Sequence, residues 1–403
     1  MSPSLSDTLA TDWAYISEGG ANVVFVYQGP PSPFFDGTAL RLRKRALIDR
    51  DQDKDQEEAE EAQDSVKEIQ SIEYQKQCLE RLIPPVHLPR LELVVVGNDA
   101  DAEAWLGTLA AECEPHRARE RRAKDCIDVT QPKALLATNL VGGQGIAVEI
   151  KPKWGFLPSP TYLSDATRGI KTQTCRFCMH THLKAQQGEK VSAGYCPLDL
   201  FSGDESRMKA ALNSLWDAWV DSDGTINNFK VFVCGKKILP DERSSTVGLV
   251  NDIADPKEAV TAALLPVLLK TPVLRTLARL QRTLDPLDIE GLAPLCALAS
   301  VGDDPTIPEW AAFVSAYLTT PAPPPADPAH LRYHALAHLL AATFKDCSLI
   351  VRVPDGSVTL IDLDPKSVDR LGKWERMDKE IVEAYAAVAE RERRVCVDAG
   401  SGL

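Results

Sequence analysis

The sequence lacks any long hydrophobic run, and none of its apolar stretches approaches the ~20 residues that a membrane-spanning helix needs. Its first residues, MSPSLSDTLATDW, contain neither a basic region nor an apolar core, so they do not have the pattern of a secretory signal. We therefore expect an intracellular protein, nuclear or cytoplasmic, that has no membrane partner.

The chain also lacks an excess of positive charge. It carries 45 Lys and Arg residues against 58 Asp and Glu residues, a formal net charge of −13. Because nonspecific binding to nucleic acids and anionic membranes is driven by positive surface charge, this balance argues against both as general partners. A small polyanion could still bind if basic residues converge in one cleft, and the candidates for such convergence are Lys151, Lys153, Lys184, Lys230, Lys366 and Arg370.

A compact cysteine framework is absent as well, since the ten cysteines are scattered along the chain. This distribution is typical of reduced thiols in an intracellular protein. Cys175, Cys178, His180 and His182 have the residue types of a zinc site, but on a single helix His180 would point about 200° away from Cys178. We therefore expect no zinc at this cluster, and magnesium as the only metal.

With 403 residues, 44% of them hydrophobic and 26% charged, the chain is expected to be globular and to form two domains. Alternating and β-branched residues predict strands, and apolar residues with helical spacing predict helices. The first domain (1–138) has expected strands at 13–16, 23–27, 38–43, 91–96 and 134–137 and a helix at 65–82. The second (139–403) has expected strands at 146–151 and 229–233, a hairpin at 348–363, and helices at 168–184, 208–220, 257–300 and 330–344. These elements predict an α+β fold.

The segment Glu18-Gly19-Gly20-Ala21-Asn22 connects the first two predicted strands. Glycines at a turn allow backbone amides to approach phosphate oxygens closely. No Gly-Lys-Ser/Thr follows, so the segment is not a Walker motif. On pattern alone, a plain hairpin turn is favoured over a nucleotide-binding loop.

Two further motifs place charge at the ends of predicted elements. Lys151 and Lys153 flank a proline, and residues i and i+2 of an extended chain share a face, although a solvated edge strand would have the same pattern. Asp346 lies just after the helix predicted at 330–344, and Asp362 lies at the end of the following hairpin. Either aspartate could take part in catalysis or could only make a local hydrogen bond. His334 and His338 are interpreted as partly buried residues of the same helix.

Five motifs occur in an order that resembles the inositol-pentakisphosphate 2-kinases. They are Glu18-Gly19-Gly20-Ala21-Asn22, Glu149-Ile150-Lys151-Pro152-Lys153-Trp154-Gly155-Phe156-Leu157, Arg176-Phe177-Cys178-Met179-His180 through Lys184, Pro197-Leu198-Asp199-Leu200-Phe201-Ser202-Gly203, and Lys345-Asp346-Cys347-Ser348 followed by Asp362-Leu363-Asp364-Pro365-Lys366. The resemblance implies a bilobal kinase-like fold with an antiparallel N-lobe sheet and a larger α/β C-lobe. It also implies ATP- and Mg²⁺-dependent phosphorylation of inositol pentakisphosphate at the 2-hydroxyl, giving phytate. A kinase of other regiochemistry and a non-catalytic inositol phosphate sensor are the alternatives.

The same resemblance assigns roles to individual residues. Asp346 is implied to be the catalytic base with Lys151 assisting, and Asp362 and Asp346 are the implied magnesium ligands. The implied nucleotide-binding residues are Gly19, Gly20, Ala21, Asn22, Arg41, Asn139, Glu149 and Asp362. The implied substrate-binding residues are Arg45, Lys151, Lys153, Lys184, Asn227, Asn228, Lys230, Lys366, Arg370 and Trp374, with one arginine from 117–122 left open.

Three departures from the family pattern qualify these assignments. Lys230 stands where an arginine is expected, which keeps the charge but not the bidentate geometry. Trp374 stands where tyrosine is common and cannot accept a hydrogen bond. The zinc-binding segment of plant relatives is not matched, since Pro294 takes the place of a histidine. We expect a monomer.

Overall fold

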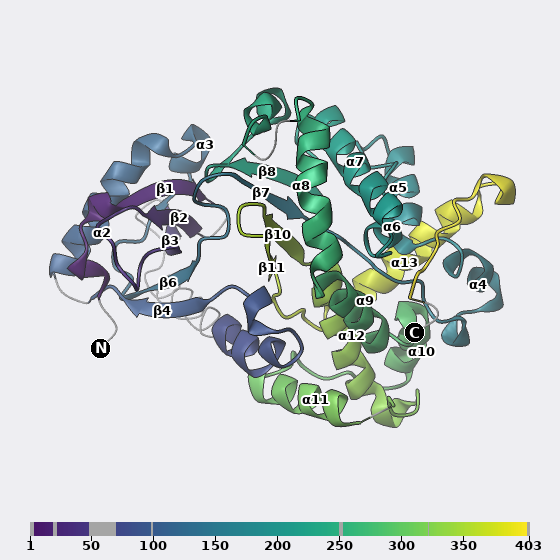
Figure 1. The fold of residues 1–403 in the computed structure, drawn as a ribbon. Helices are drawn as coiled ribbons and strands as arrows, with labels where there is room; N and C mark the ends of the chain where they lie inside the picture. Colours follow the sequence, from purple (N-terminus) through teal and green to yellow (C-terminus); the bar gives the residue numbers. More distant parts are fainter. Residues whose placement is uncertain are drawn as a thin grey trace. The chain divides into compact units, whose positions relative to one another are not determined.

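The computed structural model describes residues 4–18, 22–47, 70–97, 100–249, 253–320 and 322–400. Gly19, Gly20 and Ala21 of the expected nucleotide loop lie outside these residues. The chain forms two compact units, with the elements labelled in Figure 1. The first unit consists of Met1–Gln75, Pro89–Gln144 and Cys234–Lys236, and the second of Lys76–Leu88, Gly145–Val233 and Lys237–Leu403. The main boundary between these units falls after Gln144, compared with the expected 138, and residues 76–88 group with the second unit.

The first unit is built on an antiparallel sheet with strand order β1-β2-β3-β6-β4, and β5 pairs with β3. Val23 and Phe25 alternate along β2 and are buried with Leu40 and Leu42 of β3, so the alternating pattern does define one core-facing side. The strands are β1 (Trp13–Glu18), β2 (Asn22–Tyr27), β3 (Thr38–Ala46), β4 (Leu91–Val95), β5 (Asp125–Ile127) and β6 (Lys133–Thr138).

The helix α2 (Ala100–Cys113) was not expected from the sequence, although it completes the core of the first unit. Its residues Trp105, Leu106 and Leu109 pack with the sheet. The only other helix longer than one 3-10 turn between residues 100 and 144 is α3 (Arg119–Arg122). The predicted helix at 65–82 is described from residue 70, is helical to 77, and is followed by a 3-10 turn at Leu79–Arg81.

The second unit contains a second antiparallel sheet with strand order β11-β10-β7-β8-β9. Every residue of the central strand β7 is buried. The register pairs Ile150, the last residue of β7, with Leu349 near the start of β10, so the chain leaving β7 emerges beside the chain entering β10. The strands are β7 (Ile146–Ile150), β8 (Phe229–Val233), β9 (Lys236–Lys237), β10 (Ser348–Arg352) and β11 (Ser357–Ile361).

Helices form the rest of the second unit. In Figure 1, α7 and α8 run beside the sheet, and α12 lies against α9. The helix α13 contacts α5 and α10. The helices are α4 (Asp165–Lys171), α5 (Arg176–Gln186), α6 (Pro197–Leu200), α7 (Glu205–Asp221), α8 (Pro256–Lys270), α9 (Val273–Leu284), α10 (Asp288–Leu298), α11 (Ile307–Thr319), α12 (Leu331–Asp346) and α13 (Arg370–Ala386).

The single helix predicted at 168–184 is wrong, because the structure has two helices there with a break at residues 172–175. Cys175 is extended (φ −67°, ψ 150°) and caps α5, with its Sγ accepting a hydrogen bond from the Cys178 amide. A residue that begins a new helix cannot also continue the preceding one.

Short 3-10 turns connect many of these elements. They cover Leu5–Asp7, Ala10–Asp12, Leu79–Arg81, Pro85–His87, Glu114–His116, Pro160–Tyr162, Pro240–Thr246, Pro328–His330 and Glu390–Glu392. Among the described residues no single helix passes a length and hydropathy test for a membrane span, and one pair, Pro256–Lys270 with Val273–Leu298, passes it jointly while bent by 61°.

Candidate active site

The two lysines of the Lys-Pro-Lys motif lie just beyond the end of β7. The strand stops at Ile150 because Pro152 has no amide hydrogen to continue the ladder, so the strand predicted to reach Lys151 is one residue too long. Lys153 adopts a left-handed conformation (φ 64°), which residues other than glycine rarely take. The two lysines therefore do not share a strand face, and each reaches a different aspartate.

Those aspartates are the two that the sequence singled out. The ammonium of Lys153 lies 3.1 Å from Asp346 Oδ1, and that of Lys151 lies 3.3 Å from Asp362 Oδ2. Lys366 Nζ is 3.9 Å from the second oxygen of Asp346. Asp346 is the last residue of α12, and Asp362 directly follows β11. The β7–β10–β11 pairing thus brings two lysines and two carboxylates together from segments about 200 residues apart (|i−j| of 193 and 211).

Both carboxylates keep access to solvent, with side chains 58% and 49% exposed for Asp346 and Asp362. Burial by itself would raise the pKa of Asp346, but Lys153, Lys366 and Lys151 lower it below its ordinary value. Asp362 has φ 60°, so two non-glycine residues in left-handed conformations, Lys153 and Asp362, occur at this one place. Such backbone strain is characteristic of functional sites.

Ser348 and Glu149 lie behind Asp362. The hydroxyl of Ser348 is 3.0 Å from Asp362 Oδ2 and 3.2 Å from Glu149 Oε1. Glu149 is buried and accepts from Lys230 Nζ at 2.8 Å with both of its oxygens. Lys230 is therefore engaged by Glu149 and does not line the pocket described next, which is where a substrate lysine was expected.

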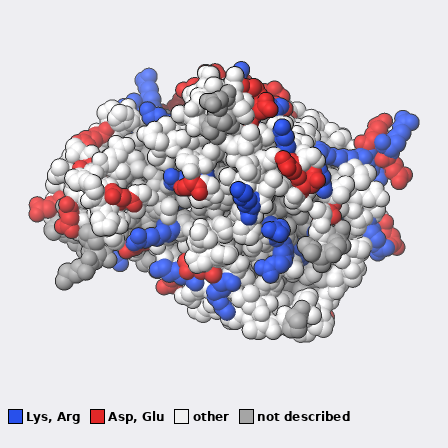
Figure 2. Space-filling model, viewed as in Figure 1, with Lys and Arg blue, Asp and Glu red and all other residues white. Residues whose placement is uncertain are grey.

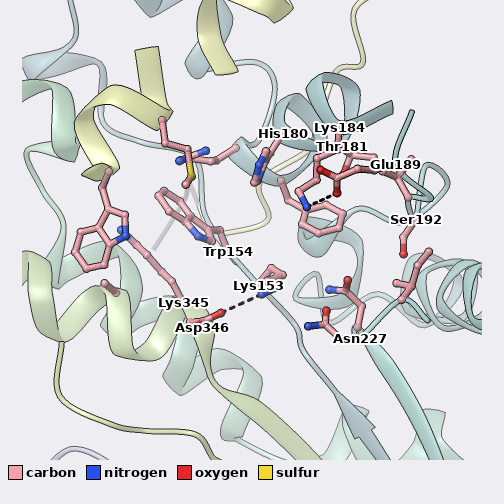
Figure 3. Close-up of a pocket in the computed structure, with 18 of the residues that line it drawn as sticks. Lys153, Trp154, His180, Thr181, Lys184, Glu189, Ser192, Asn227, Lys345 and Asp346 are labelled. Atoms are coloured by element: carbon pink, nitrogen blue, oxygen red, sulfur yellow. Dashed lines mark hydrogen bonds and ion pairs between the residues drawn. The ribbon is translucent and has the colours of Figure 1, made fainter. Parts of the chain in front are cut away.

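A pocket of about 780 Å³ opens beside these carboxylates, and all of its lining residues belong to the second unit. Figure 3 shows Asp346 and Lys153 facing each other at one side of this pocket and Lys184 with Glu189 at another. Seven lysine and arginine residues but only two carboxylates line it. Of the residues predicted to bind substrate, it collects Lys153, Lys184, Asn227, Asn228, Lys366, Arg370 and Trp374.

One face of α5 supplies three basic residues to the pocket at four-residue intervals, Arg176, His180 and Lys184. Lys184 is paired with Glu189 at 2.7 Å. Burial, together with the charges of Arg176 and Lys184, lowers the pKa of His180 from 6.5 to about 4, so this imidazole is neutral near pH 7. His180 was considered only as a zinc ligand, although its spacing from Arg176 and Lys184 could have identified it as a pocket residue.

Another wall of the pocket is formed by a buried network that the sequence did not reveal. Lys345 bridges Asp285 and the face of Trp154, with its Nζ 4.0 Å from the ring centroid. Asp285 also accepts from His338 Nδ1 at 2.8 Å. Burial alone would raise the pKa of Asp285, but Lys345 and His338 hold it below its ordinary value.

Trp374 completes this wall, with its ring centroid 5.7 Å from that of His338. This contact agrees with the packing role that was expected of a tryptophan at this position. Lys366, Arg370 and Trp374 are spaced four residues apart, as on one side of a helix, but α13 begins only at Arg370, so Lys366 lies in the preceding loop.

Four predicted ligand residues belong to the first unit and do not line this pocket. Asn22 and Arg43 face each other across β2 and β3, and Arg41 lies opposite Val24. Arg45 pairs in register with Cys126 of β5. Asn139 is buried and accepts from the Gly142 amide at 2.8 Å, which shapes the turn after β6.

Arg117 is the member of the 117–122 group that the structure removes from consideration as a substrate ligand. It is 2% exposed, donates to Glu18 at 2.9 Å and to Glu114 at 3.1 Å, and contacts Asp125. Burial would lower the pKa of its guanidinium, but these partners raise it. A side chain so fully bonded stabilises the first unit, and the choice among Arg119, Arg121 and Arg122 stays open.

Lys44 shares this network, lying 3.4 Å from Glu18 and 3.0 Å from Asp125. Its side chain is 2% exposed, so Lys44 is a buried cation of the first unit. On the face drawn in Figure 2, acidic and basic side chains are interspersed. The local excess of cations in the pocket therefore contrasts with the acidic balance of the whole chain.

Comparison with known proteins identifies the chain's family. The family model described as "Inositol-pentakisphosphate 2-kinase" matches residues 15–380, which is most of the sequence. The chain belongs to this family. The matched range includes both units and every predicted site residue.

Individual relatives agree. The protein named "Inositol-pentakisphosphate 2-kinase" from Cryptococcus neoformans var. neoformans is 34% identical over 94% of this chain and 95% of its own length. The Arabidopsis thaliana protein of the same name is 27% identical over 94% of each chain. A Danio rerio protein of that name is 45% identical, but only over 23% of this chain and 18% of its own length.

Proposed function

We propose that this protein is a kinase that transfers the γ-phosphate of ATP to the 2-hydroxyl of inositol pentakisphosphate, giving inositol hexakisphosphate. The observation that carries this proposal is the pair of lysine-bridged carboxylates, Asp346 and Asp362, beside a cation-rich pocket. Membership of the inositol-pentakisphosphate 2-kinase family supports the same conclusion.

The pocket suits an inositol ring that carries several phosphates. Lysine and arginine side chains bind phosphate through charge-assisted hydrogen bonds, and the pocket concentrates them in one place. Asn227 and Asn228 add amide donors, and the N-terminus of the 17-residue helix α13 at Arg370 favours an anion nearby. Trp154 and Trp374 also line the pocket.

Asp346 is the residue that we assign to the attacking hydroxyl. Its lowered pKa keeps it ionised at neutral pH, so it can accept a hydrogen bond and then the proton from an alcohol. Phosphoryl transfer has a loose transition state, so positioning of the nucleophile matters more than the strength of the base. Lys153 fixes the orientation of Asp346, and Lys151 supplies positive charge where the transferred phosphoryl group would gain negative charge.

The donor set fits a magnesium ion. Mg²⁺ prefers oxygen ligands, and Asp362 and Asp346 each have a partly exposed carboxylate. Both are at present neutralised by lysines, whose role a bound cation could take over. A magnesium ion held there would neutralise phosphate charge.

For the nucleotide we propose contacts from the first unit, including Asn22, Arg41 and Asn139, with Gly19, Gly20 and Ala21. The amide oxygen of Asn22 is buried without a hydrogen-bond partner among the described residues, which leaves it able to accept one from a ligand. Within the second unit, Ser348 links Asp362 to Glu149, which is buried.

Product mapping by nuclear magnetic resonance tests the function. The purified chain is incubated with ATP, Mg²⁺ and inositol pentakisphosphate, and we expect inositol hexakisphosphate as the product. Phosphorylation of other inositol polyphosphates at another hydroxyl, with this substrate left unchanged, would indicate a kinase of different regiochemistry. Binding without any product would indicate a non-catalytic sensor.

A further inference from the structure

Four cysteines that are far apart in the sequence meet at a single point in the second unit. Cys175, Cys178, Cys196 and Cys396 are all buried, and their sulfur atoms lie within 4.8 Å of one another. The sequence drew attention to the first two, but paired them with His180 and His182. In the structure, His180 lines the pocket described above. Cys196 and Cys396, and not the two histidines, lie beside Cys175 and Cys178.

We propose that these four cysteines bind a structural zinc ion. A tetrahedral zinc ion with Zn–S bonds of about 2.3 Å separates its sulfur ligands by about 3.8 Å. The Sγ atoms of Cys175 and Cys196 are 3.9 Å apart. A disulfide would need about 2.05 Å, and all four cysteines are free thiols.

The surrounding backbone has the features of a thiolate–metal site. Cys175 and Cys178 have the Cys-x-x-Cys spacing of structural zinc sites and lie at the N-terminus of the 11-residue helix α5, whose partial positive charge stabilises thiolates. The Cys178 amide points at Cys175 Sγ from 3.5 Å. Binding converts four thiols into four thiolates and releases four protons, leaving a site with a net charge of about −2.

A positively charged side chain, Arg394, lies near these four cysteines. The guanidinium of Arg394 donates to the carbonyls of Ala193, Gly194 and Tyr195, the turn that delivers Cys196. The amide of Cys396 donates to the carbonyl of Gln173 at 2.8 Å, just before Cys175. All three ligand-bearing segments are therefore already held in place around the sulfurs.

The buried acidic cluster of the same unit provides a contrast. Asp288, Glu290 and Asp378 also approach one another closely, but the ammonium of Lys171 lies 2.9 Å from Asp378 and 3.3 Å from Glu290. That cluster already contains its cation. The cysteine cluster packs against Leu157, Phe177 and Leu198, and the nearby Arg394 donates to backbone carbonyls, so a metal ion is the group that would complete the four thiols.

The position of the site suggests its purpose. It joins the start of α5, which carries Arg176, His180 and Lys184 into the pocket, to the C-terminal segment near residue 396. Tyr195, next to Cys196, donates its hydroxyl to the carbonyl of Pro152 at 2.9 Å, between Lys151 and Lys153. The zinc ion would thus fix two walls of the phosphate pocket without contacting substrate.

Metal analysis of the purified full-length chain tests the proposal, and it is independent of whether the chain is a kinase. After exhaustive dialysis under reducing conditions, we expect about one zinc ion per chain, released when a mercurial reagent blocks the thiols. The double variant Cys178→Ser/Cys396→Ser should lose this zinc, whereas Cys234→Ser, a change at an exposed cysteine elsewhere, should keep it.

If the double variant does not fold, wild-type protein still decides the question. Replacing zinc by Co²⁺ should produce the intense thiolate-to-cobalt charge-transfer absorption of a four-cysteine site. Iron in place of zinc, a disulfide among these cysteines in freshly reduced protein, or a metal-free chain with no cobalt absorption would each overturn the proposal.

Discussion

The second unit contains two kinds of carboxylate that differ in how their charge is balanced. Asp285 and Asp288 are 3% exposed, and each is neutralised by a buried lysine, Lys345 or Lys171. The aspartates at the pocket are about half exposed and have looser lysine contacts of 3.1–3.9 Å. The buried carboxylates are shielded from solvent, whereas the more exposed ones can exchange their partners. The same residue types therefore serve structure in one place and chemistry in the other.

The largest effect should come from the pocket aspartate. Asp346→Asn keeps the shape but removes the proton acceptor, so we expect turnover to fall by about 10²–10⁴ with both ligands still bound. Steady-state kinetics and calorimetry measure these two quantities. The control is Asp241→Asn, a change at an exposed aspartate in the turn Pro240–Thr246. Turnover near that of the wild type would remove Asp346 from the mechanism.

Substitution of a buried lysine should instead lower the stability of the folded chain. Lys171→Met leaves Asp288 and Asp378 close together without their cation, which we expect to cost about 3–5 kcal/mol of unfolding free energy. Burial alone would lower the pKa of Lys171, but the two aspartates raise it, so the lysine is charged in the native state. Denaturant unfolding measures the loss, with the exposed pair Lys379–Glu375 as a comparison through Lys379→Met. If Lys171→Met loses no more unfolding free energy than Lys379→Met, the proposed difference between buried and exposed ion pairs is wrong.

The pocket lysines should affect binding and not folding. Lys184→Ala and Lys366→Ala should each weaken binding of inositol pentakisphosphate about ten- to hundredfold, because a hydrogen bond to a charged group is worth about 1.5–3 kcal/mol. Affinity for ATP and the unfolding midpoint should change little. Calorimetry at two salt concentrations also tests whether substrate binding weakens as ions screen the contacts. Equal substrate affinity in variants and wild type would show that the phosphates bind elsewhere.

Substitution of Asp362 should change the magnesium requirement of the activity. Asp362→Asn removes one negative charge from the proposed magnesium site, and we expect the Mg²⁺ concentration for half-maximal activity to rise at least about tenfold. A magnesium titration of activity at saturating ATP measures it, with Ser357→Ala at the start of β11 as the control. An unchanged titration would assign the metal to other residues.

The smallest expected effect is on the pH dependence of stability. The pKa of His180 is lowered from 6.5 to about 4 in the folded chain, so on acidification the unfolded chain takes up this proton first. The stability of the unliganded protein should therefore fall as the pH drops from 6.5 toward 4, with no further contribution below. His180→Gln should flatten that part of the profile, and a bound polyphosphate should do the same in wild type by favouring the protonated ring. An identical profile for the variant would show that other groups cause the slope.

Much of the local structure could be predicted from the sequence, and the errors have identifiable causes. The strands of both sheets except β5 and β9, and the helices α7 and α12, follow from residue periodicity, whereas α8, α9 and α10 were expected only as one helical stretch at 257–300. The helix α2 was missed because its apolar residues do not form a clear stripe. The break before α5 was missed because a cysteine is not a usual helix cap. Asp346 and Asp362 were predicted as a pair through motif order, and the structure brings them together.

What the sequence alone determined is therefore most of the secondary structure elements, the motif residues and the family to which the chain belongs. Only the tertiary structure decided that Lys151 pairs with Asp362 and Lys153 with Asp346, that Lys230 and Arg117 are engaged by buried carboxylates, and that Cys396 joins Cys175. Periodicity reports the few neighbours along the chain that share a face. Ion pairing and metal coordination depend instead on distances of 3–4 Å between side chains that lie up to about 220 residues apart, and only the folded chain defines these distances.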